Sequence, residues 1–406
     1  IVAFILYGIF FGEQRADPEA YCPFGGLQAI GSYLHNNSLA CSMSMAQIMM
    51  GVVLAVGVIL FSKLFCGYLC PLGTIGEYLG KGGRKLKMNF DLKPGGIADR
   101  GLRIVKYGLL FVVFYMSVSS SELFCKNFDP YYAMATGFKG EITAWMTSIS
   151  IVLLFLGSFF IKMFWCKYIC PLGALSNIFK FTITFVGLLL LFWLLGWAGL
   201  PSAWVWALGA ACLIGYLYEM IYLRSKVFPL LRIVRDAESC NGCGSCTKKC
   251  PYHIDLKELK TVRHIDCTLC GDCVSSCPKG SLQVGGKKSL RWLPGILTIV
   301  LFVLALILGN QWELPTIDER WGNTEQVGEM KTFEMEGLTS IKCYGSSKAF
   351  SAKMQKVPGV YGVKTFVKRH AVVISYDPAQ TNEDKIREVI FIPTIMKFSN
   401  PEPQVD

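Results

Sequence analysis

The chain has 406 residues, of which 52% are hydrophobic and 17% are charged, and its formal net charge is +11. Soluble globular domains carry about 25% charged residues, so this composition excludes a single soluble domain and intrinsic disorder. The excess of lysine and arginine fits either nucleic-acid binding or basic loops on the inner side of a membrane. The 17 cysteines are too many for an ordinary membrane channel.

Six apolar stretches are long enough, or nearly long enough, to cross a bilayer, which takes roughly 20 mainly apolar residues. The chain also opens on an apolar run over residues 1–11, which we interpret as the end of a further membrane helix. The sequence therefore predicts about seven spans in a mainly α-helical membrane protein with an internal repeat. The six stretches are residues 43–65, 102–120, 143–165, 181–200, 203–223 and 293–310.

Lysine and arginine are unevenly distributed among the loops between these stretches. Segments 81–106 and 224–235 are rich in them, and the first includes Arg103 and Lys106, whereas the loop before residue 43 and segment 121–141 are mixed. Positive residues accumulate in cytoplasmic loops, so we expect the two basic segments inside and the other two outside. This topology explains the net charge without a nucleic-acid partner, for which the chain has no motif. It also puts residues 235–288 inside and residues 313–406 outside.

The pattern C-x2-C-x2-C-x3-C-P occurs twice, at residues 240–251 and 267–278. This run ligates [4Fe–4S] clusters, and each fourth cysteine crosses to the other cluster. Gly242, Gly244 and Gly271 allow close backbone approach to a cluster. Zinc is the main alternative, because paired C-x2-C motifs also bind zinc, while a reducing compartment disfavours disulfides. The crossing rule assigns the first cluster to Cys240, Cys243, Cys246 and Cys277 and the second to Cys250, Cys267, Cys270 and Cys273.

This segment resembles a bacterial two-cluster ferredoxin. The resemblance implies that two clusters held close together pass single electrons, without chemistry at a substrate. His253 and His264 flank the cysteines. We expect both to be surface or hydrogen-bonding residues, because every cluster position already has a cysteine.

Two further motifs resemble each other, F-C-G-Y-L-C-P-L-G at residues 65–73 and W-C-K-Y-I-C-P-L-G at residues 165–173. In each, the two cysteines are four residues apart, on one face of a helix, and the proline is expected to end that helix. On one interpretation, pseudo-symmetry brings Cys66, Cys70, Cys166 and Cys170 together at the inner membrane surface. Four thiolates there would suit a further iron–sulfur cluster or another soft metal. The alternative is that each pair only packs a helix end against the ferredoxin segment.

Cys22 and Cys125 each lie on the outer side, upstream of one of these motifs, so the membrane part looks like two copies of one unit. A contact between Cys22 and Cys125, as a disulfide or a redox centre, would follow from the repeat. Cys41 has no counterpart in the second copy, and Cys212 lies inside a predicted span. We expect the last two to be packing residues.

Membrane helices with duplicated C-x3-C-P motifs, followed by a two-cluster ferredoxin segment, resemble the NapH/NosR type of polyferredoxin over residues 15–285. Those proteins serve periplasmic nitrate and nitrous oxide reduction and carry electrons between the quinone pool and partner redox proteins. The resemblance implies a multi-pass protein of the bacterial inner membrane, in contact with membrane lipid, the quinone pool and a redox partner protein. It would be an electron-transfer subunit of a quinol-linked oxidoreductase. The C-terminal extension departs from the minimal pattern, so the identity of the partner is not carried over.

A quinone needs an apolar slot near the membrane surface with a few polar groups. Tyr216, Tyr218, Glu219 and Tyr222 lie at the inner end of the stretch 203–223, where Glu219 is the only acid. An ionisable residue at membrane depth is a candidate functional residue. The alternative is that these side chains simply meet lipid headgroups.

Residues 331–392 alternate between strand and helix patterns, with strands at 331–336, 361–367 and 371–376 and helices ending near 355 and 390. This βαββαβ order resembles a heavy-metal-associated domain, which has a ferredoxin-like α+β fold and binds Cu(I) through G-M-x-C-x-x-C. Here Ser340 stands at the first cysteine position and only Cys343 remains. Because one thiolate is a poor metal site, we favour a docking or structural module over metal binding.

The leading hypothesis is a membrane-bound iron–sulfur protein that passes electrons between the quinone pool and a redox partner. The alternative is an assembly factor or copper reductase for a respiratory metalloenzyme, like the CcoG/FixG proteins, which also join membrane spans to a ferredoxin segment and an outer domain. A third hypothesis, a cluster-dependent transcription or redox sensor, has little support, because the sequence has no DNA-binding motif. The expected domains are a transmembrane domain at 1–234, the ferredoxin domain at 235–288, a last membrane helix at 289–312 and an outer domain at 313–406.

Overall fold

The computed structural model describes residues 22–36, 45–90, 92, 95–120, 124–135, 138, 142–199, 204–222, 230–257, 259–286, 288–311, 314–322, 330–341, 344–367 and 369–391. The chain divides into two compact units, one of residues 1–36 and 43–313 and the other of residues 37–42 and 314–406. The predicted membrane helix at residues 1–11, Cys41 and Cys343 lie outside the described residues.

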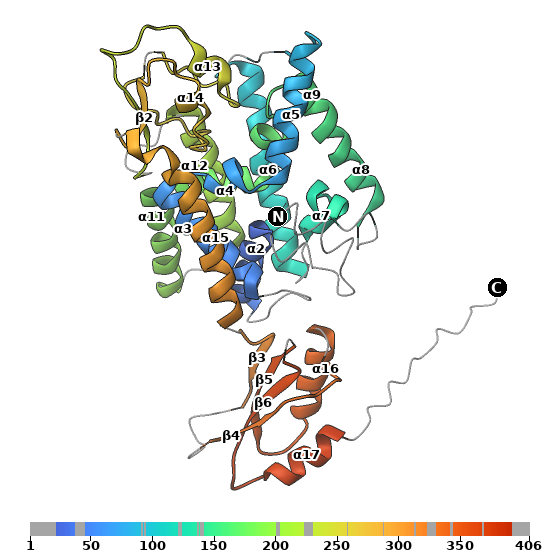
Figure 1. Cartoon of the computed structure of the whole chain (residues 1–406). Helices are drawn as coiled ribbons and strands as arrows, with labels where there is room; N and C mark the ends of the chain where they lie inside the picture. The colour runs from blue at the N-terminus through green and yellow to red at the C-terminus, as the bar shows by residue number, and fades with distance from the viewer. Residues whose placement is uncertain are drawn as a thin grey trace, which may run out of the picture. The chain divides into compact units, whose positions relative to one another are not determined.

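The first unit is mostly helical (Figure 1). Helix α3 (Met45–Phe61) packs against α2 (Pro23–Asn36) and α15 (Leu293–Gln311), and α6 (Ile97–Ser120) packs against α12 (Trp204–Tyr222). The other helices of the membrane part are α4 (Leu64–Tyr68), α5 (Pro71–Lys85), η2 (Phe124–Asn127), α7 (Pro130–Ala135), α8 (Ala144–Val152), η3 (Leu153–Gly157), α9 (Ser158–Phe160), η4 (Trp165–Ile169), α10 (Pro171–Lys180), α11 (Thr182–Trp197) and η5 (Lys288–Trp292).

Three helices in the described part are long and apolar enough to cross a membrane, at residues 97–119, 204–221 and 290–309. Helices α10 and α11 add a fourth candidate if they count as one span, although they meet at an angle of 91°. Two other predicted stretches form shorter apolar helices, Gln47–Phe61 and Ala144–Phe160. The described residues thus contain three or four candidate spans where the sequence predicted about seven.

The shorter helices end at identifiable backbone breaks. Ser62, directly after α3, has a φ of 85°, in the left-handed region that a non-glycine residue rarely adopts. Ile161, directly after α9, is extended, with a φ of −126° and a ψ of 126°. Hydropathy averaged over about 20 residues did not reveal either break, because both stretches stay apolar on average although Lys63 and Lys162 directly follow Ser62 and Ile161.

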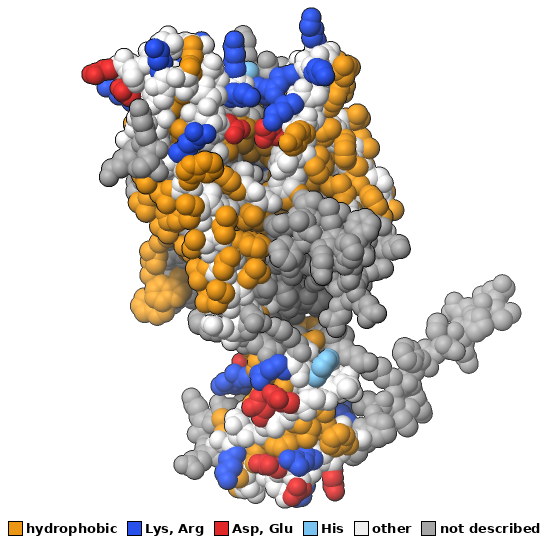
Figure 2. Space-filling model, in the orientation of Figure 1, with side chains coloured by type: hydrophobic (Ala, Val, Ile, Leu, Met, Phe, Trp, Pro, Cys, Tyr) orange, Lys and Arg blue, Asp and Glu red, His pale blue; other side chains and the backbone are white. Residues whose placement is uncertain are grey.

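Exposed apolar side chains cover several helices of this unit, as expected for contact with lipid (Figure 2). Leu190 and Trp193 on α11 and Ile299 on α15 are among them. Lysine and arginine side chains gather at one end of the same unit, around α5 and the ferredoxin segment (Figure 2). This separation of apolar and basic surface is what a membrane protein with one basic side presents.

The ferredoxin segment begins and ends in a two-stranded antiparallel sheet of β1 (Ile233–Arg235) and β2 (Leu282–Val284). Between them lie the short helices α13 (Ser245–Lys249) and α14 (Asp272–Ser275), which contact each other. The sheet joins the two ends of the segment, so both cysteine runs are held in one small body.

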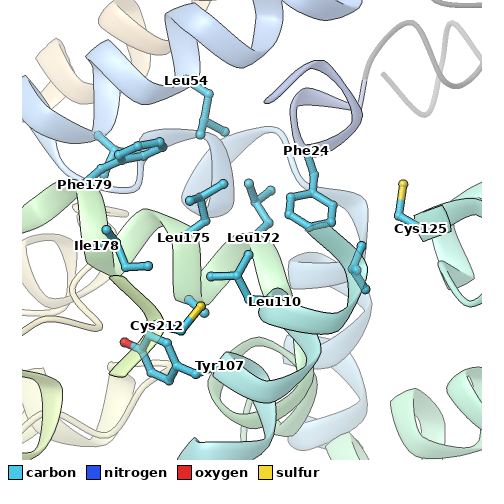
Figure 3. Packing of buried hydrophobic residues seen from close by; sticks show 13 residues of the cluster. Phe24, Leu54, Tyr107, Leu110, Cys125, Leu172, Leu175, Ile178, Phe179 and Cys212 are labelled. Atoms are coloured by element: carbon cyan, nitrogen blue, oxygen red, sulfur yellow. The ribbon is translucent and has the colours of Figure 1, made fainter. Parts of the chain in front are cut away.

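An apolar cluster fills the membrane part, with residues from α2, α3, α6, α10 and α12 (Figure 3). Leu110 and Leu175 lie inside it, together with Cys212 and Cys125. Cys212 is therefore a packing residue, as its sequence context predicted.

The second unit contains a four-stranded antiparallel sheet in the order β3-β5-β6-β4. Its elements are β3 (Ile317–Arg320), β4 (Lys331–Met335), α16 (Tyr344–Met354), β5 (Val360–Phe366), β6 (Ala371–Tyr376) and α17 (Glu383–Phe391). From β4 to α17 these follow the segments expected from sequence, whereas β3, which pairs with β5, was not predicted. The last strand of the predicted βαββαβ order would follow residue 391, outside the described residues.

Candidate iron–sulfur and cysteine sites

The two cysteine loops of the ferredoxin segment follow the same backbone course. Gly244 and Gly271, with φ of 73° and 82°, directly precede α13 and α14. Two residues earlier, Gly242 and Leu269 are also left-handed, with φ of 68° and 56°. Since leucine adopts this conformation in one loop, positive φ, and not the absence of a side chain, is what the two loops share at this position.

Backbone N–H groups point at the cysteine sulfurs in both loops. The equivalent amides of Gly242 and Leu269 donate to Cys240 and Cys267. Such N–H···S hydrogen bonds favour thiolate over thiol and are characteristic of iron–sulfur ligation, so the residues present fit [4Fe–4S] clusters. The remaining donors are Asp272 to Cys270, Tyr252 and Ile254 to Cys250, and Lys279, Ser281 and Leu282 to Cys277.

The second loop docks on the membrane part, while the first is more open. Ser62 Oγ donates to the Cys267 carbonyl oxygen at 2.7 Å, and Tyr68 Oη donates to the Leu269 carbonyl oxygen at 3.0 Å. In contrast, Cys243 of the first loop is exposed. The second predicted cluster site therefore lies against the C-x3-C-P region, and the first has a ligand in contact with solvent.

The two C-x3-C-P motifs have matching local structure. Cys70 and Cys170 are extended, with ψ of 115° and 114°, and each directly precedes a helix, α5 or α10. The preceding helices end at Tyr68 and Ile169, just before the proline, as expected, but the proline also begins the next helix, which was not predicted. Proline is favoured at the first helical position, where its missing N–H costs no hydrogen bond. The two cysteines of each motif also do not share one helix, because Cys66 and Cys70 lie on either side of the end of α4.

A glycine three residues after the second cysteine completes each motif. The amides of Gly73 and Gly173 donate to the sulfurs of Cys70 and Cys170. A Cβ on Gly73 would lie 3.1 Å from the Cys66 carbonyl oxygen, and a Cβ on Gly173 would lie 3.0 Å from that of Cys166. The motif thus folds back on its own first cysteine, and this close approach requires glycine.

The two motifs approach each other. Burial raises the pKa of the Cys70 thiol well above its usual value, and the neighbouring Cys66, Cys166 and Cys170 raise it further. Burial likewise raises the pKa of Cys170 to about 12. Buried thiols of this kind stay protonated and unreactive unless a metal takes the place of the proton.

Cys22 and Cys125 precede the two C-x3-C-P motifs in the sequence but lie near them in the structure. Together with Cys70 and Cys170 they line an apolar cavity of about 70 Å³. In the described part of the chain, no three metal-ligating side chains converge as a single metal ion would require. The ferredoxin cysteines also do not converge in this way. A [4Fe–4S] cluster does not require such convergence, because each of its four irons binds a different thiolate and the thiolates therefore lie apart.

Tyr252 connects the two kinds of cysteine site. It follows Cys250 by two residues, it is buried, and its side chain hydrogen-bonds Cys166. A continuous contact therefore leads from the end of the first cysteine run, where Cys250 is assigned to the second cluster, to the C-x3-C-P motifs.

A buried network of charged side chains, which the sequence did not predict, lies beside the second loop. Arg103 binds Asp99 at 3.1 Å, Asp266 at 2.9 Å and also Glu219. Lys106 binds the same Glu219 at 2.7 Å. Arg103 and Lys106 are therefore not the surface charges of a basic loop that we expected, because both side chains are buried.

Glu219 is fully occupied by this network. Besides the two cations, Tyr107 Oη donates to it at 2.6 Å and Asn177 Nδ2 at 2.7 Å. Because Glu219 is buried and bound by four side chains, the interpretation that it meets lipid headgroups was wrong, whereas the role near a quinone stays a prediction. Tyr216 packs edge-on against Tyr107 and Tyr218 packs against Phe181, while the side chain of Tyr222 lies outside those described.

A polar cavity of about 440 Å³ borders the network and falls in the size range of small-ligand sites. His253 and His264 both line it. His264 Nδ1 accepts a hydrogen bond from the Asp266 amide at 3.2 Å, which agrees with the hydrogen-bonding role expected for it. Burial lowers the pKa of His264 to about 4.

Two sequence families match the chain in these regions. A 4Fe-4S binding domain matches residues 43–89 and 143–183, and a 4Fe-4S dicluster domain matches residues 232–278. The first match covers both C-x3-C-P motifs, and the second covers both ferredoxin runs completely.

Several curated proteins are similar to the chain. It is 30% identical to the putative electron transport protein YccM of Escherichia coli (strain K12) over 257 residues, which are 62% of this chain and 58% of that protein. It is 34% identical to the regulatory protein NosR of Stutzerimonas stutzeri over 127 residues, 30% of this chain and 17% of that protein. It is 31% identical to the ferredoxin-type protein NapH of Haemophilus influenzae over 119 residues, 29% of this chain and 38% of that protein.

The chain thus spans less than two thirds of the length of each of these relatives. No solved structure matches it. The two 4Fe–4S families, the named relatives and the cysteine loops described above agree with one another. The chain therefore carries 4Fe–4S domains and, over these parts, is similar to iron–sulfur proteins of the NapH/NosR polyferredoxin type.

Proposed function

We propose that this chain is a membrane-bound electron-transfer protein that passes single electrons between the quinone pool and a redox partner. The name of YccM and the two 4Fe–4S families support the electron-transfer part of the proposal. The basic end of the first unit faces the cytoplasm of a bacterium, in line with its charge (Figure 2). Residues 313–406 then lie on the outer side and serve as a docking or structural module.

The observation that carries this proposal is the set of N–H···S hydrogen bonds in the ferredoxin segment. Five of the eight cysteines receive them: Cys240, Cys250, Cys267, Cys270 and Cys277. [4Fe–4S] clusters bound at these positions supply one-electron centres. The chain itself orients the thiolates and, through Ser62 and Tyr68, holds the second loop against the membrane part.

Serine substitutions combined with EPR spectroscopy of the reduced full chain test the two sites. We expect Cys243→Ser to alter only the signal of the first cluster and Cys270→Ser only that of the second. Cys212→Ser is the matched control, because Cys212 lies in the apolar cluster, and its spectrum should equal that of the wild type. Unchanged spectra in both ligand variants would contradict the assignment.

We further propose that Cys66, Cys70, Cys166 and Cys170 hold an additional cluster or soft metal. The 4Fe-4S binding domain family matches both motifs, and the amides of Gly73 and Gly173 donate to Cys70 and Cys170 as amides do in the ferredoxin loops. If the centre is a [4Fe–4S] cluster, Cys166→Ser should lower the iron content by about four atoms per chain. An iron and copper content equal to that of the wild type would support the packing interpretation instead.

A role in copper reduction or oxidase assembly is the second candidate. It is favoured by the four cysteines around the apolar cavity, because thiolates in a dry site suit Cu(I). Titration of the full chain with Cu(I) distinguishes the two functions. Stoichiometric binding that Cys125→Ser abolishes would favour copper chemistry, and the absence of binding would leave electron transfer alone.

A further inference from the structure

The buried ionisable groups of the described part do not balance in charge. Five buried basic side chains accompany three buried carboxylates, an excess of two positive charges when all of them are ionised. A buried charge is costly unless an opposite charge lies nearby, so this excess needs a counter-charge. The cations are Lys63, Arg103, Lys106, Lys167 and Lys180, and the carboxylates are Asp99, Glu219 and Asp266.

Two of these cations lie against the second cysteine loop. Lys180 Nζ donates to the carbonyl oxygens of Ile265 at 2.6 Å and Cys267 at 3.0 Å. Lys63 follows Ser62, whose hydroxyl binds the same Cys267 carbonyl oxygen. Lys63 and Lys180 are only 5% and 3% exposed, and both act electrostatically on the Cys267 thiol.

A [4Fe–4S] cluster with four thiolate ligands carries a net charge of about −2 when oxidised and one negative charge more when reduced. A cluster at the second site would therefore supply counter-charge to Lys63 and Lys180, which also act electrostatically on Cys66 of the proposed additional site. We propose that Lys63 and Lys180 hold the reduction potential of the second cluster above that of the first. This inference rests on the proposed binding of both clusters.

Burial and nearby cations act in opposite directions on this potential. Burial alone lowers it, because a low-dielectric surrounding disfavours the extra negative charge of the reduced cluster. Desolvated ammonium groups beside the cluster raise it, because their attraction is barely screened. The first site has an exposed ligand, Cys243, and its neighbouring cations are screened by water: Arg235, which hydrogen-bonds Cys240, is partly exposed, and Lys248 and Lys249 are exposed. A single electron shared by the two clusters then resides on the second.

EPR-monitored redox titration of the purified, cluster-loaded full chain tests the proposal. The variants are Lys180→Met, Lys63→Met and the charge-conserving Lys180→Arg. Lys249→Met is the matched control, because Lys249 is exposed but adjoins Cys250, a ligand of the second cluster. Signals are assigned with Cys243→Ser, which changes a ligand of the first cluster only.

We expect the second cluster to have the higher potential in the wild type. At a given potential, Lys180→Met and Lys63→Met should each raise the ratio of oxidised to reduced second cluster at least tenfold. For a one-electron couple this is a lowering of the reduction potential by 59 mV. The first cluster should not move. Lys180→Arg and Lys249→Met should stay within about threefold of the wild type, since a retained charge, or the loss of a charge that water already screens, changes the potential little.

A second cluster with the lower potential, or an equal shift in Lys249→Met and Lys180→Met, would overturn the inference. If Lys180→Met does not fold, Lys63→Met decides, because it leaves both hydrogen bonds of Lys180 in place. An iron-free wild-type protein would contradict the proposed function itself. Two loaded clusters in the opposite order would contradict only this inference.

Discussion

Glu219 is the acceptor that holds the buried charge network together, so its neutralisation is the sharpest test of the membrane part. Glu219→Gln keeps the shape of the side chain but removes the charge that Arg103 and Lys106 face. Arg103 retains Asp99 and Asp266, whereas Lys106 loses its carboxylate partner. Breaking a buried ion pair on one side costs about 3–5 kcal/mol. At about 2 °C per kcal/mol for a large domain, the apparent Tm should fall by about 6–10 °C.

The assay is thermal unfolding in detergent, followed by tryptophan fluorescence at one fixed heating rate. Lys106→Met in the Glu219→Gln background removes the isolated cation, so the double variant should melt above the single variant. Asp255→Asn, an exposed carboxylate near the same polar cavity, is the control and should change Tm little. A Glu219→Gln protein that melts within 1 °C of the wild type, or a double variant with additive losses, would refute the reasoning.

Two other predictions concern the cysteine region. Gly73→Ala should destabilise the protein by about 1–3 kcal/mol, because the new Cβ would lie 3.1 Å from the Cys66 carbonyl oxygen. Gly82→Ala on the same helix is the control; its Cβ would have its nearest atom at 4.0 Å, so it should be neutral or slightly stabilising. Equal changes in the free energy of unfolding, measured by denaturant titration, would exclude the proposed backbone contact. The pKa of His264 is lowered to about 4 by burial, below its usual 6.5, so its contribution to stability is full above pH 6.5 and is lost as the pH falls toward 4. Between pH 7 and pH 5 this amounts to about 2 kcal/mol, and the denaturation midpoint of His264→Gln should depend less on pH over this range; an identical pH dependence in both proteins would show that another group is responsible.

The ferredoxin loops and the positions of most helices could be predicted from the sequence because their signals are local. Cysteine spacing and hydropathy are read from a few consecutive residues. The role of Pro71 and Pro171 could not be decided this way, since proline both stops a helix and begins one. The length of the spans was also overestimated, because a single lysine after each of the breaks at Ser62 and Ile161 does not make the surrounding stretch polar on average.

The buried charge network could not be predicted because its partners are far apart along the chain. Arg103 and Glu219 are separated by 116 positions and Arg103 and Asp266 by 163. From sequence, Arg103 and Lys106 look like ordinary residues of a basic loop. The one available signal was Glu219 itself, a single acid in an apolar helix, which requires a buried cation or a functional role.

Iron and acid-labile sulfide analysis of the purified full chain, together with EPR of the reduced protein, tests the central claim most directly. The two proposed clusters predict at least about eight iron and eight sulfide per chain, and about twelve of each if the C-x3-C-P motifs hold a third. A colourless, iron-free protein that carries zinc at the eight ferredoxin cysteines would contradict the account.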